Sequence, residues 1–441
     1  INQRDGLFDS LIPLAPEKKF SLNAQSVFST YVIGVATNRD AWVSGFSKDK
    51  VASNMLSMIN FYNHSIGIET YSEDKTKISW TRGLRNDLSK GLKYDFDEAE
   101  FVTTTYRPFT KQHLYYHRPF IECPGLWQRI YPSTQYNNIV IAVSGVGQQK
   151  PFSPFITDNI SDLQVVDKAQ YFPLFFYDEN KNRENSLFDD EETNRYIRRD
   201  GITDWILKEV RNRFGGSRII TKEHIFYYVY GLLHSKQYRE RFADDLKKSL
   251  PRIPIVDNVQ DFMAFYKAGK ELADIHLNYE QGINVQTTGH DGDYIFFAEM
   301  PMFAHRFFGV KVIGDIDIWQ NEWANDTYQH FAVEKMKFAK VRDENGKLIS
   351  DKTRIIYNGH ITIENIPLKA YEYIVNGKSA IEWIMERYTV TIDKASQIKN
   401  DPNDWSKEHE QPRYILDLLL SVIILSCRTV DIVNSLPTFR V

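Results

Sequence analysis

Two Asn-Gly turns in the last third of the chain constrain its fold most strongly, because they pair strands that are adjacent in the sequence. The segment RDENGK (342–347) joins VEKMKFAKV to TRIIYN, and Asn-Gly at 358–359 leads into HITIENI. Alternating apolar and polar residues on both sides of such turns predict antiparallel strands. Strands grouped in this way, without a helix between each pair, indicate an α+β fold rather than a regular βαβ chain.

Other helix and strand patterns also come in groups. Segments with the apolar, β-branched composition of strands lie at 28–37, 101–109, 112–120 and 137–147. Apolar residues recur at helical spacing in 47–66, 80–91, 221–250, 378–388 and 413–428. Ser47 and Thr221 are expected N-caps, and a break near Gly231 to Lys236 is expected to divide the long segment into two helices. We therefore expect an α+β fold of mixed β-sheets and hairpins with packed helices.

Length and cysteine content bound the organisation of the chain. With 441 residues, it is expected to hold two or three domains. Its two cysteines cannot build a disulfide framework, which favours a reducing cytoplasm. The apolar run at 414–427 contains Asp417 and is too short to span a membrane, so no membrane partner is expected. The chain opens on INQRDG without an initiating methionine, which indicates a fragment of a larger protein.

Charge is segregated along the chain. The formal net charge is −4, but residues 195–252 contain fourteen Lys and Arg against seven Asp and Glu. An acidic segment at 178–192 is expected to be a solvated loop. A local basic region can bind a polyanion even when the whole chain is acidic. Within it, RNRFGGSR (211–218) carries two glycines that let the backbone approach a ligand closely, whereas we interpret the cations of 239–248 as a solvated helix face.

The stretch YRPFTKQHLYYHRPF (106–120) has two interpretations. Its aromatic residues are interspersed with Arg107, Lys111, His113, His117 and Arg118. Arg and Lys neutralise phosphates and bind guanine edges, while aromatic faces pack on sugars and bases. A sheet with one buried face produces a similar pattern, with the cations on an ordinary surface. The residues of this stretch alone slightly favour the second interpretation.

Common cofactor motifs are absent from the sequence. NNIVIAVSGVG (137–147) superficially resembles a nucleotide or S-adenosylmethionine loop, but Pro151 and Pro154 follow where a helix would have to begin. We interpret it as a strand that ends in a tight turn. No P-loop, HExxH or GxSxG sequence occurs. The group His290, Asp291 and Asp293 could bind a metal, but a glycine-rich surface turn explains it better. No cofactor is therefore expected in this chain.

Four stretches in the same order carry a family resemblance. They are YRPFTKQHLYY, AVSGVGQQKPFSPFITDNISDLQVVDKAQYFPLFFY, ITKEHIFYYVYGLLHSKQYRERFADDLKKSLPRIP and YNGHITIENIPLKAYEYIVNGKSAIEWIMERY. As an ordered set they resemble the C-terminal specificity domain of type ISP restriction–modification enzymes. The resemblance runs, with gaps, from about residue 30 to about residue 430.

In that family, one long polypeptide carries a nuclease, a helicase-like ATPase, a coupling segment, an adenine-N6 methyltransferase and a target-recognition domain. The resemblance implies a methyltransferase-like α/β domain whose C-terminal portion is 1–66, then a connector at 67–100 and a target-recognition domain at 101–441. It implies S-adenosylmethionine, ATP and Mg²⁺ for the parent enzyme. The methyltransferase signature Asn-Pro-Pro-Tyr, the ATPase motifs and the nuclease carboxylates are absent here. The chain alone is therefore not expected to methylate DNA, hydrolyse ATP or cut.

The resemblance also implies two partners, double-stranded DNA and the other domains of the parent polypeptide. Phosphate contacts would position the chain on DNA, and base-edge contacts would specify the sequence. The predicted DNA-contacting residues are Arg82, Arg85, Arg107, Lys111, Gln112, His113, Tyr115, Arg118, Gln148, Gln149, Lys150, Arg211, Arg213 and Arg218. We expect one exposed, positively charged surface to hold Arg107, Lys111, His113 and Arg118.

Two other functions remain open at this point. The chain could be a partner-binding or structural domain of the same complex without direct base contacts, and its binding to DNA would then lack a steep salt dependence. It could also be a self-contained enzyme with an unrecognised site near His290 to Asp293, and the isolated chain would then turn over a substrate.

Overall fold

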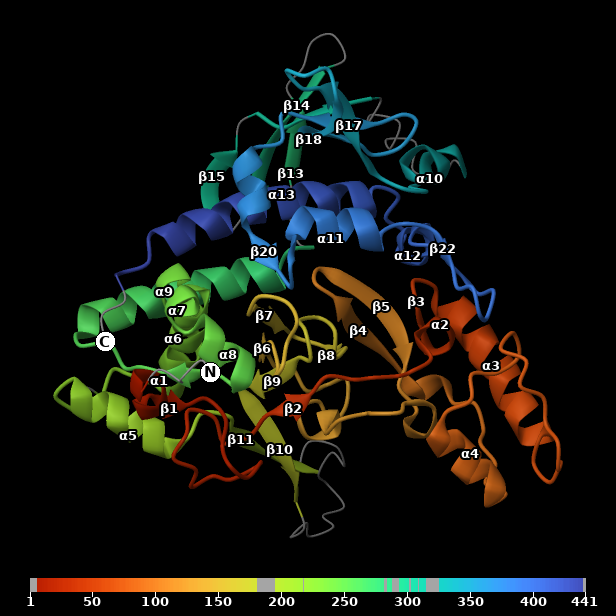
Figure 1. Cartoon of the computed structure of the whole chain (residues 1–441), viewed down its shortest axis with the longest axis horizontal. Coiled ribbons are helices and arrows are strands. Elements are labelled where there is room, and N and C mark those ends of the chain that lie inside the picture. The colour runs from red at the N-terminus through yellow and green to blue at the C-terminus, as the bar shows by residue number, and fades with distance from the viewer. Residues whose placement is uncertain are drawn as a thin grey trace, which may run out of the picture.

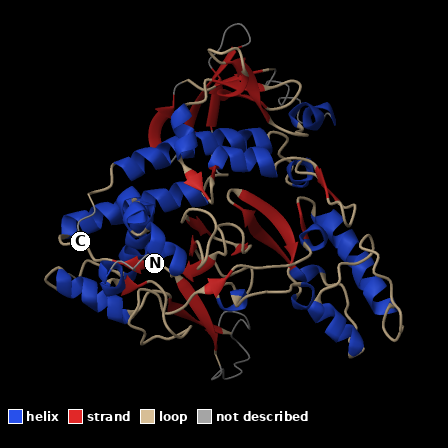
Figure 2. Ribbon diagram, in the orientation of Figure 1, coloured by secondary structure: helices blue, strands red, loops and turns tan. Residues whose placement is uncertain are grey.

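The computed structural model describes most of the chain, namely residues 6–180, 195–216, 218–280, 284–287, 293–300, 303–307, 309–314 and 325–438. Figure 1 shows a helical arm formed within residues 40–89, a body of small sheets and helices that contains the N-terminus, and a C-terminal sheet that two helices separate from the body. Figure 2 shows that helices and strands are intermixed rather than regularly alternating. The fold is α+β, as the grouped strands predict.

Two four-stranded sheets form the centre of the body. The first has the order β2-β9-β6-β7 and consists of β2 (Val32–Ile33), β6 (Val140–Val143), β7 (Pro154–Thr157) and β9 (Gln170–Pro173). The second has the order β3-β5-β4-β8 and consists of β3 (Ser44–Gly45), β4 (Phe101–Arg107), β5 (Thr110–Tyr115) and β8 (Ile160–Ser161). The antiparallel β4–β5 hairpin confirms the strand–turn–strand predicted within 101–120.

The segment 28–37 is not the single continuous strand that its composition predicts. Only β2 pairs regularly, with β9, while Val35 forms an isolated bridge to Asp162 beside the second sheet. Between them, a Cβ on Gly34 would lie 2.5 Å from the Cα atom of Leu163. The segment therefore passes from one sheet to the other, and the close approach at Gly34 prevents a regular ladder.

The C-terminal sheet confirms both Asn-Gly turns. It consists of β13 (Asn284–Thr287), β14 (Asp293–Met300), β15 (Phe303–Phe307), β16 (Lys311–Ile313), β17 (Lys337–Arg342), β18 (Leu348–Ile356) and β19 (Thr362–Glu364). The order is β13-β14-β16-β19-β18-β17, with β15 paired to β14. Gly346 has a φ of +74°, which glycine adopts readily in the β17–β18 turn. In the next turn, Asn358 Oδ1 accepts hydrogen bonds from the backbone N–H groups of His360 and Ile361.

Capping side chains mark several of the helix boundaries in the arm and the body. Those of the arm are α2 (Asp40–Val43), α3 (Lys48–His64) and α4 (Arg82–Ser89). Those of the body are α1 (Gly6–Ser10), α5 (Asp204–Arg213), α6 (Lys222–His234), α7 (Lys236–Arg241), α8 (Ala243–Lys248) and α9 (Val259–Leu277). The side chains of Ser47 and Thr221 accept N-cap hydrogen bonds, as predicted. Ser235 ends α6 and caps α7, so the long helical segment breaks where expected.

Further elements close the chain and its edges. The helices are α10 (Asn325–Phe331), α11 (Ala380–Arg387), α12 (Asn403–Glu408) and α13 (Tyr414–Asn434). The two-stranded ladders are β1 (Ile12–Pro13) with β12 (Arg252–Ile253), β10 (Phe175–Glu179) with β11 (Tyr196–Asp200), β20 (Ile374–Val375) with β21 (Lys378–Ser379), and β22 (Thr391–Ile392) with β23 (Lys399–Asn400). None of the described helices is long and apolar enough to cross a membrane.

Two hydrophobic cores hold these elements together. One contains α3, the β4–β5 hairpin, α11 and most of α13. The other contains α5, α6 and α9 together with Phe8 and Phe28 from the N-terminal segment. The domain boundaries at 66/67 and 100/101 stay predictions. The pairing of β1 with β12 and of β2 with β9 shows that the first 36 residues contribute strands to the body.

Helices α6 and α9 approach each other closely at two glycines. A Cβ on Gly231 would lie 2.2 Å from the carbonyl oxygen of Phe265, and a Cβ on Gly269 would lie 1.8 Å from that of Tyr227. Both distances are far inside van der Waals contact, so neither position has room for a methyl group without separating the two helices.

We expect Gly269→Ala to destabilise the chain, because the two helix backbones would have to move apart. Overpacking of this kind costs about 1–3 kcal/mol of unfolding free energy. Urea denaturation of the chain measures the change. Gly359→Ala is the matched control, since its added methyl group would meet nothing within 4 Å. Equal stability of the two variants would contradict the assigned helix contact.

Candidate functional site

A cleft of about 690 Å³ lies between the helical arm and the body. Its walls come from five segments that are distant in sequence: 35–42, residues 73–80 with Arg85, Arg107 at the end of β4, 162–164, and 393–396 in the β22–β23 turn. Both cations and carboxylates line the cleft. The cations are Arg39, Lys75, Arg85 and Arg107, and the carboxylates are Asp40, Glu73, Asp162 and Asp393.

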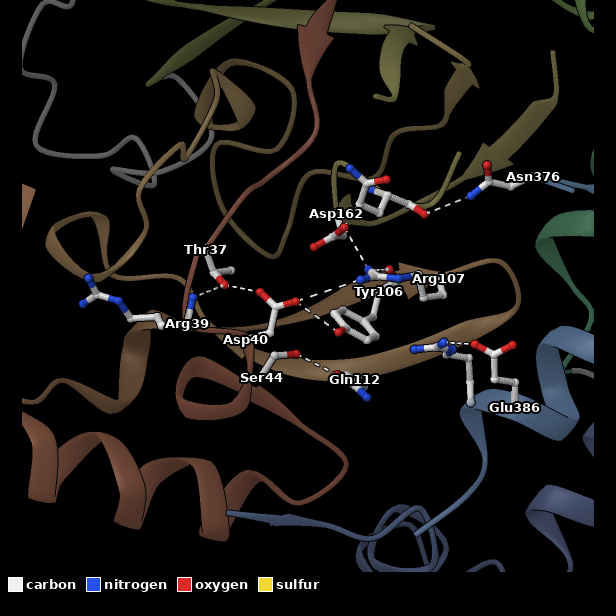
Figure 3. A network of polar contacts seen from close by, with 12 residues as sticks. Thr37, Arg39, Asp40, Ser44, Tyr106, Arg107, Gln112, Asp162, Asn376 and Glu386 are labelled. Carbon is white, nitrogen blue, oxygen red and sulfur yellow. Dashed lines mark hydrogen bonds and ion pairs between the residues drawn. The ribbon is translucent and has the colours of Figure 1, made fainter. Parts of the chain in front are cut away.

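Arg107 is the centre of a polar network on the cleft wall (Figure 3). Its Nη1 donates a hydrogen bond to Asp162 Oδ1 at 2.8 Å, and its Nη2 lies 3.9 Å from Asp40 Oδ2. The guanidinium carbon lies 3.9 Å from the ring centroid of Tyr106, whose hydroxyl donates to Asp40 at 3.0 Å. Thr37 donates to the same carboxylate. Arg107 therefore links the first residue of α2 to the loop after β8.

Burial perturbs the titration of this network. Burial raises the pKa of Asp162 to about 6, and the positive charge of Arg107 opposes that rise. Arg39, in the same cleft wall, has its pKa lowered by burial to about 10. Its Nη2 donates to Thr81 at 2.7 Å, while its Nε and Nη1 find no hydrogen-bond partner among the described residues.

Two of the predicted DNA-contacting residues, Arg85 and Arg107, meet at this cleft. Arg85 in α4 donates to both carboxylate oxygens of Glu73, at 2.6 and 2.7 Å, and to the hydroxyl of Tyr71. Arg82, the first residue of the same helix, is exposed. Sequence analysis missed Arg39, Asp40 and Asp162. The only signal was the polar turn TNRD (37–40) directly after an apolar strand segment.

The expectation of one exposed basic surface for Arg107, Lys111, His113 and Arg118 is wrong. Arg118 is exposed, but the side chains of the other three are largely buried. Lys111 pairs with Glu280 at 2.5 Å, and His113 Nε2 lies 3.1 Å from Glu408 Oε2. The reason is that this face of β5 packs against residues from the C-terminal half instead of facing solvent.

Two further predicted contacts belong to the interior. Gln112, on the opposite face of β5, accepts a hydrogen bond from Ser44 at 2.8 Å. Tyr115 is fully buried and stacks on Phe96, and its hydroxyl accepts from the backbone N–H of Asp97. Neither side chain has an exposed surface with which to meet a ligand in this conformation.

The remaining predicted residues lie in two regions that do not line the cleft: the turn after β6, and the end of α5 with the loop that follows it. In the turn after β6, Gln148 is buried whereas Gln149 and Lys150 are exposed. The carboxylate of Asp167 accepts from the backbone N–H groups of both exposed residues and fixes the turn. No helix follows β6, as the two prolines predict.

Arg211 and Arg213 lie in the last turn of α5 and Arg218 lies in the loop after it, and the three side chains have different surroundings. Arg211 donates through Nε and Nη2 to the carbonyl oxygen of Ile220. Arg213 pairs with Asp257 at 2.6 Å, and Arg218 is exposed. Arg239 in α7 departs from the solvated helix face we expect there, because its side chain is only partly exposed and its Nε is buried without a hydrogen-bond partner among the described residues. Metal binding at His290, Asp291 and Asp293 falls outside the side chains that the structure describes, and no group of three His, Cys, Asp or Glu in the described part could hold a metal ion.

We expect Arg107→Gln to destabilise the chain, and to do so more at high pH. Removing one partner of a buried pair costs about 3 kcal/mol, because the other charge stays buried. The folded pKa of Asp162 is above its ordinary value, so the carboxyl binds more protons in the folded chain between about pH 4 and pH 6, and stability falls as pH rises through that window. Without Arg107 this pKa rises further, so the loss of stability is larger where Asp162 is ionised.

Urea denaturation at about pH 5 and about pH 8 measures the difference, because the two values lie on either side of the Asp162 titration. The double variant Arg107→Gln, Asp162→Asn is the control, since it removes the uncompensated charge and should regain part of the stability at the higher pH. An equal loss at both pH values, with no recovery in the double variant, would contradict the network.

Three solved structures share this fold over the whole chain. The ATP-dependent type ISP restriction–modification enzyme LlaBIII bound to DNA matches with a TM-score of 0.79 and 35% identity, over 100% of this chain and 25% of that chain. A nuclease-deletion mutant of the type ISP enzyme LlaGI, in complex with a DNA substrate mimic, matches with a TM-score of 0.75 and 34% identity. The match covers 100% of this chain and 35% of that chain. A DrdV–DNA complex matches with a TM-score of 0.75 and 26% identity, over 100% of this chain and 39% of that chain.

The chain thus spans a quarter to two fifths of the length of these relatives. No curated protein matches it. Residues 26–418, which include the cleft and most of both cores, match the model of one family. The chain belongs to the type ISP C-terminal specificity domain family.

Proposed function

We propose that this chain recognises a specific sequence in double-stranded DNA, as the C-terminal part of a type ISP restriction–modification enzyme. One observation carries the proposal. LlaBIII and the LlaGI mutant, both above 30% identity and matched over all of this chain, were each solved with DNA or a DNA mimic. A specificity domain has to hold the duplex through its phosphates and discriminate base pairs through the grooves.

In this proposal the chemistry belongs to other parts of the parent enzyme. LlaBIII is ATP-dependent. We propose that the parent of this chain likewise uses ATP with Mg²⁺, and S-adenosylmethionine for adenine-N6 methylation, in the cytoplasm. The chain would position the target adenine for methylation or the DNA for restriction. Residues 1–66 and 67–100 are proposed as the end of the methyltransferase region and a connector.

The exposed members of the predicted set are the best candidates for DNA contact. They are Arg82, Arg118, Gln149, Lys150, Arg213 and Arg218. The buried ion pairs of Arg107 and Lys111 give these residues another role, because breaking such a pair to bind a phosphate would leave a carboxylate buried and unpaired. Among the exposed residues, Gly215 and Gly216 beside Arg213 and Arg218 have positive φ and open space around them.

We expect the chain to bind duplex DNA with an affinity that falls steeply with salt, since phosphate contacts release counterions. Neutralising Arg213 and Arg218 to Gln should weaken binding to all duplexes alike and flatten the salt slope by about 0.9 log units for each phosphate that the variant no longer binds. Arg211 is left intact because its guanidinium holds the carbonyl oxygen of Ile220.

The measurement is a binding titration at several salt concentrations. Lys247→Gln, Lys248→Gln is the matched control, because it removes the same charge from the exposed end of α8. If the salt slope changes in the Lys247, Lys248 control and not in the Arg213, Arg218 variant, the end of α8 contacts the phosphates and the end of α5 with the loop after it does not. Failure of the unmodified chain to bind any duplex would overturn the proposed function itself.

We expect Gln149→Ala to change sequence preference more than overall affinity, because a glutamine amide can pair with both hydrogen-bonding atoms of an adenine edge. Gln148 is kept, since it is buried in the turn and its loss would disturb the backbone. Selection of bound duplexes from a random pool compares the two proteins. An equal loss of affinity for selected and random DNA would indicate a structural role for Gln149.

A further inference from the structure

We propose that the β17–β18 hairpin enters the major groove of the DNA and contacts base edges. The inference rests on the proposed function and goes beyond it, because it assigns sequence discrimination to a segment, 340–350, that contains none of the predicted DNA-contacting residues. Three properties of the hairpin support it: its geometry, the side chains on its two faces and its attachment to the rest of the chain.

The outer half of the hairpin projects from the protein. Every residue from 340 to 350 is exposed except Asp343, which is partly buried. Among the described strands, β17 lies at the edge of its sheet and β18 alone is hydrogen-bonded to it. Figure 1 places β17 and β18 in the region beyond α11 and α13, on the opposite side from the helices of the body. The segment is thus free to meet a large partner.

The tip is nevertheless a fixed structure. The carboxylate of Asp343 accepts hydrogen bonds from the backbone N–H groups of Asn345 and Lys347, both at 2.9 Å. The backbone N–H of Asp343 donates to the carbonyl oxygen of Lys347, and Arg342 Nη1 donates to that of Gly346 at 2.7 Å. A turn held in this way costs little ordering entropy when a partner binds.

The dimensions of the hairpin match a major groove. Two antiparallel strands lie about 4.8 Å apart, and the groove is about 12 Å wide, so a two-stranded ribbon with its side chains fills it. The three paired positions at the end of each strand, 340–342 and 348–350, extend about 10 Å at about 3.4 Å per residue. That length is close to the groove depth of about 8.5 Å.

The strand register separates the side chains at the tip onto two faces. Val341 pairs with Ile349, and these two share one face. Lys340 pairs with Ser350 and Arg342 with Leu348, so these four share the other. One face can contact thymine methyl groups, and the other carries an arginine that can bind guanine and a lysine and serine that can bind phosphates or bases.

Exposed apolar side chains on both faces of the tip support a role in binding. Val341, Leu348 and Ile349 are 44%, 57% and 41% exposed, and they lie within one short hairpin. Clustered apolar residues on a protruding surface mark an interaction site. A neighbouring protein domain could also cover them, so the charge has to decide between the two occupants.

Charge favours DNA as the occupant. Lys340, Arg342 and Lys347 surround the apolar side chains, and none of the three forms an ion pair with any residue that the structure describes. The hydrogen bonds of Lys340 and Arg342 go to a hydroxyl and a carbonyl, which leave their charge uncompensated. Asp343 and Glu344 carry the two opposing charges of the tip, so its three cations leave residues 340–350 with a net charge of +1, although the whole chain has a net charge of −4.

The base of the hairpin is anchored to the protein. Ala339 and Ile355 are buried there, and Phe338 packs on Tyr371. Lys352 pairs with Glu382 at 3.2 Å and Arg354 with Glu364 at 3.2 Å. The base of the hairpin therefore holds the tip in a fixed position, as accurate contacts with bases require.

The test compares two double variants of the full chain with the unmodified protein. Lys340→Ala, Arg342→Ala removes the basic face, and Val341→Ser, Ile349→Ser removes the apolar face. Lys208→Ala, Lys267→Ala is the charge-matched control, from exposed positions of α5 and α9. Circular dichroism and a thermal melt establish that each variant is folded.

For the basic face, we expect a lower affinity for duplex DNA, by about tenfold on the selected sequence, and a salt slope reduced by about 0.9 for each phosphate that the variant no longer binds. For the apolar face, we expect a changed sequence preference after selection from a random duplex pool. Replacing thymine with uracil at the selected positions removes the methyl groups and should weaken the unmodified chain but not the serine variant.

Two outcomes separate the hairpin from the proposed function. If the unmodified chain binds duplex DNA and both hairpin variants keep its affinity, salt slope and selected sequence, the hairpin proposal is wrong and the tip docks on protein instead. If the unmodified chain binds no duplex, the proposed function fails first. An equal loss in the Lys208, Lys267 control would show a general charge effect and would also overturn the hairpin proposal.

Discussion

Burial of the β4–β5 hairpin on both of its faces is the constraint on which the rest of the structure depends. β3 pairs with the edge of β5 and α3 from the arm packs against that strand, while Lys111 and His113 on one face of β5 meet Glu280 and α12 from the C-terminal half. Phe109, at the turn, is fully buried and packs against Phe155, Tyr279 and Tyr373 from three other segments. Its φ of +55° is unusual for a residue with a side chain, and the surrounding contacts hold it there.

This burial changes what the charged residues of the hairpin can do. Arg107 and Lys111 lie against carboxylates, and removal of one partner of such a pair is costly, so they link the arm, the body and the C-terminal half. Charges suited to a polyanion lie at the periphery instead. The loop after α5, the turn after β6 and the tip of β17–β18 present exposed cations or amides on a fixed backbone. Side chains on such segments can vary without disturbing the core.

The sequence by itself determined the local elements of this protein. Capping at Ser47 and Thr221, the helix break at Ser235 and the two Asn-Gly turns follow from contacts within a few residues, so their signals are complete in the local sequence. The order of four longer stretches was sufficient to indicate the family. For the caps, the helix break and the turns, the residues that form the deciding contact are the same residues that make up the sequence signal.

Only the tertiary structure decided which side chains are accessible. Alternation along β5 is the same whether a face meets solvent or another segment, and Glu280, the partner of Lys111, is 169 positions away. The division of 28–37 between two sheets depends on Leu163, which approaches Gly34 from a distant part of the chain. A periodic pattern indicates how polar one face of a strand is, but the residues that bury this face come from elsewhere in the sequence. The cleft and the network of Arg107 could therefore be found only in the tertiary structure.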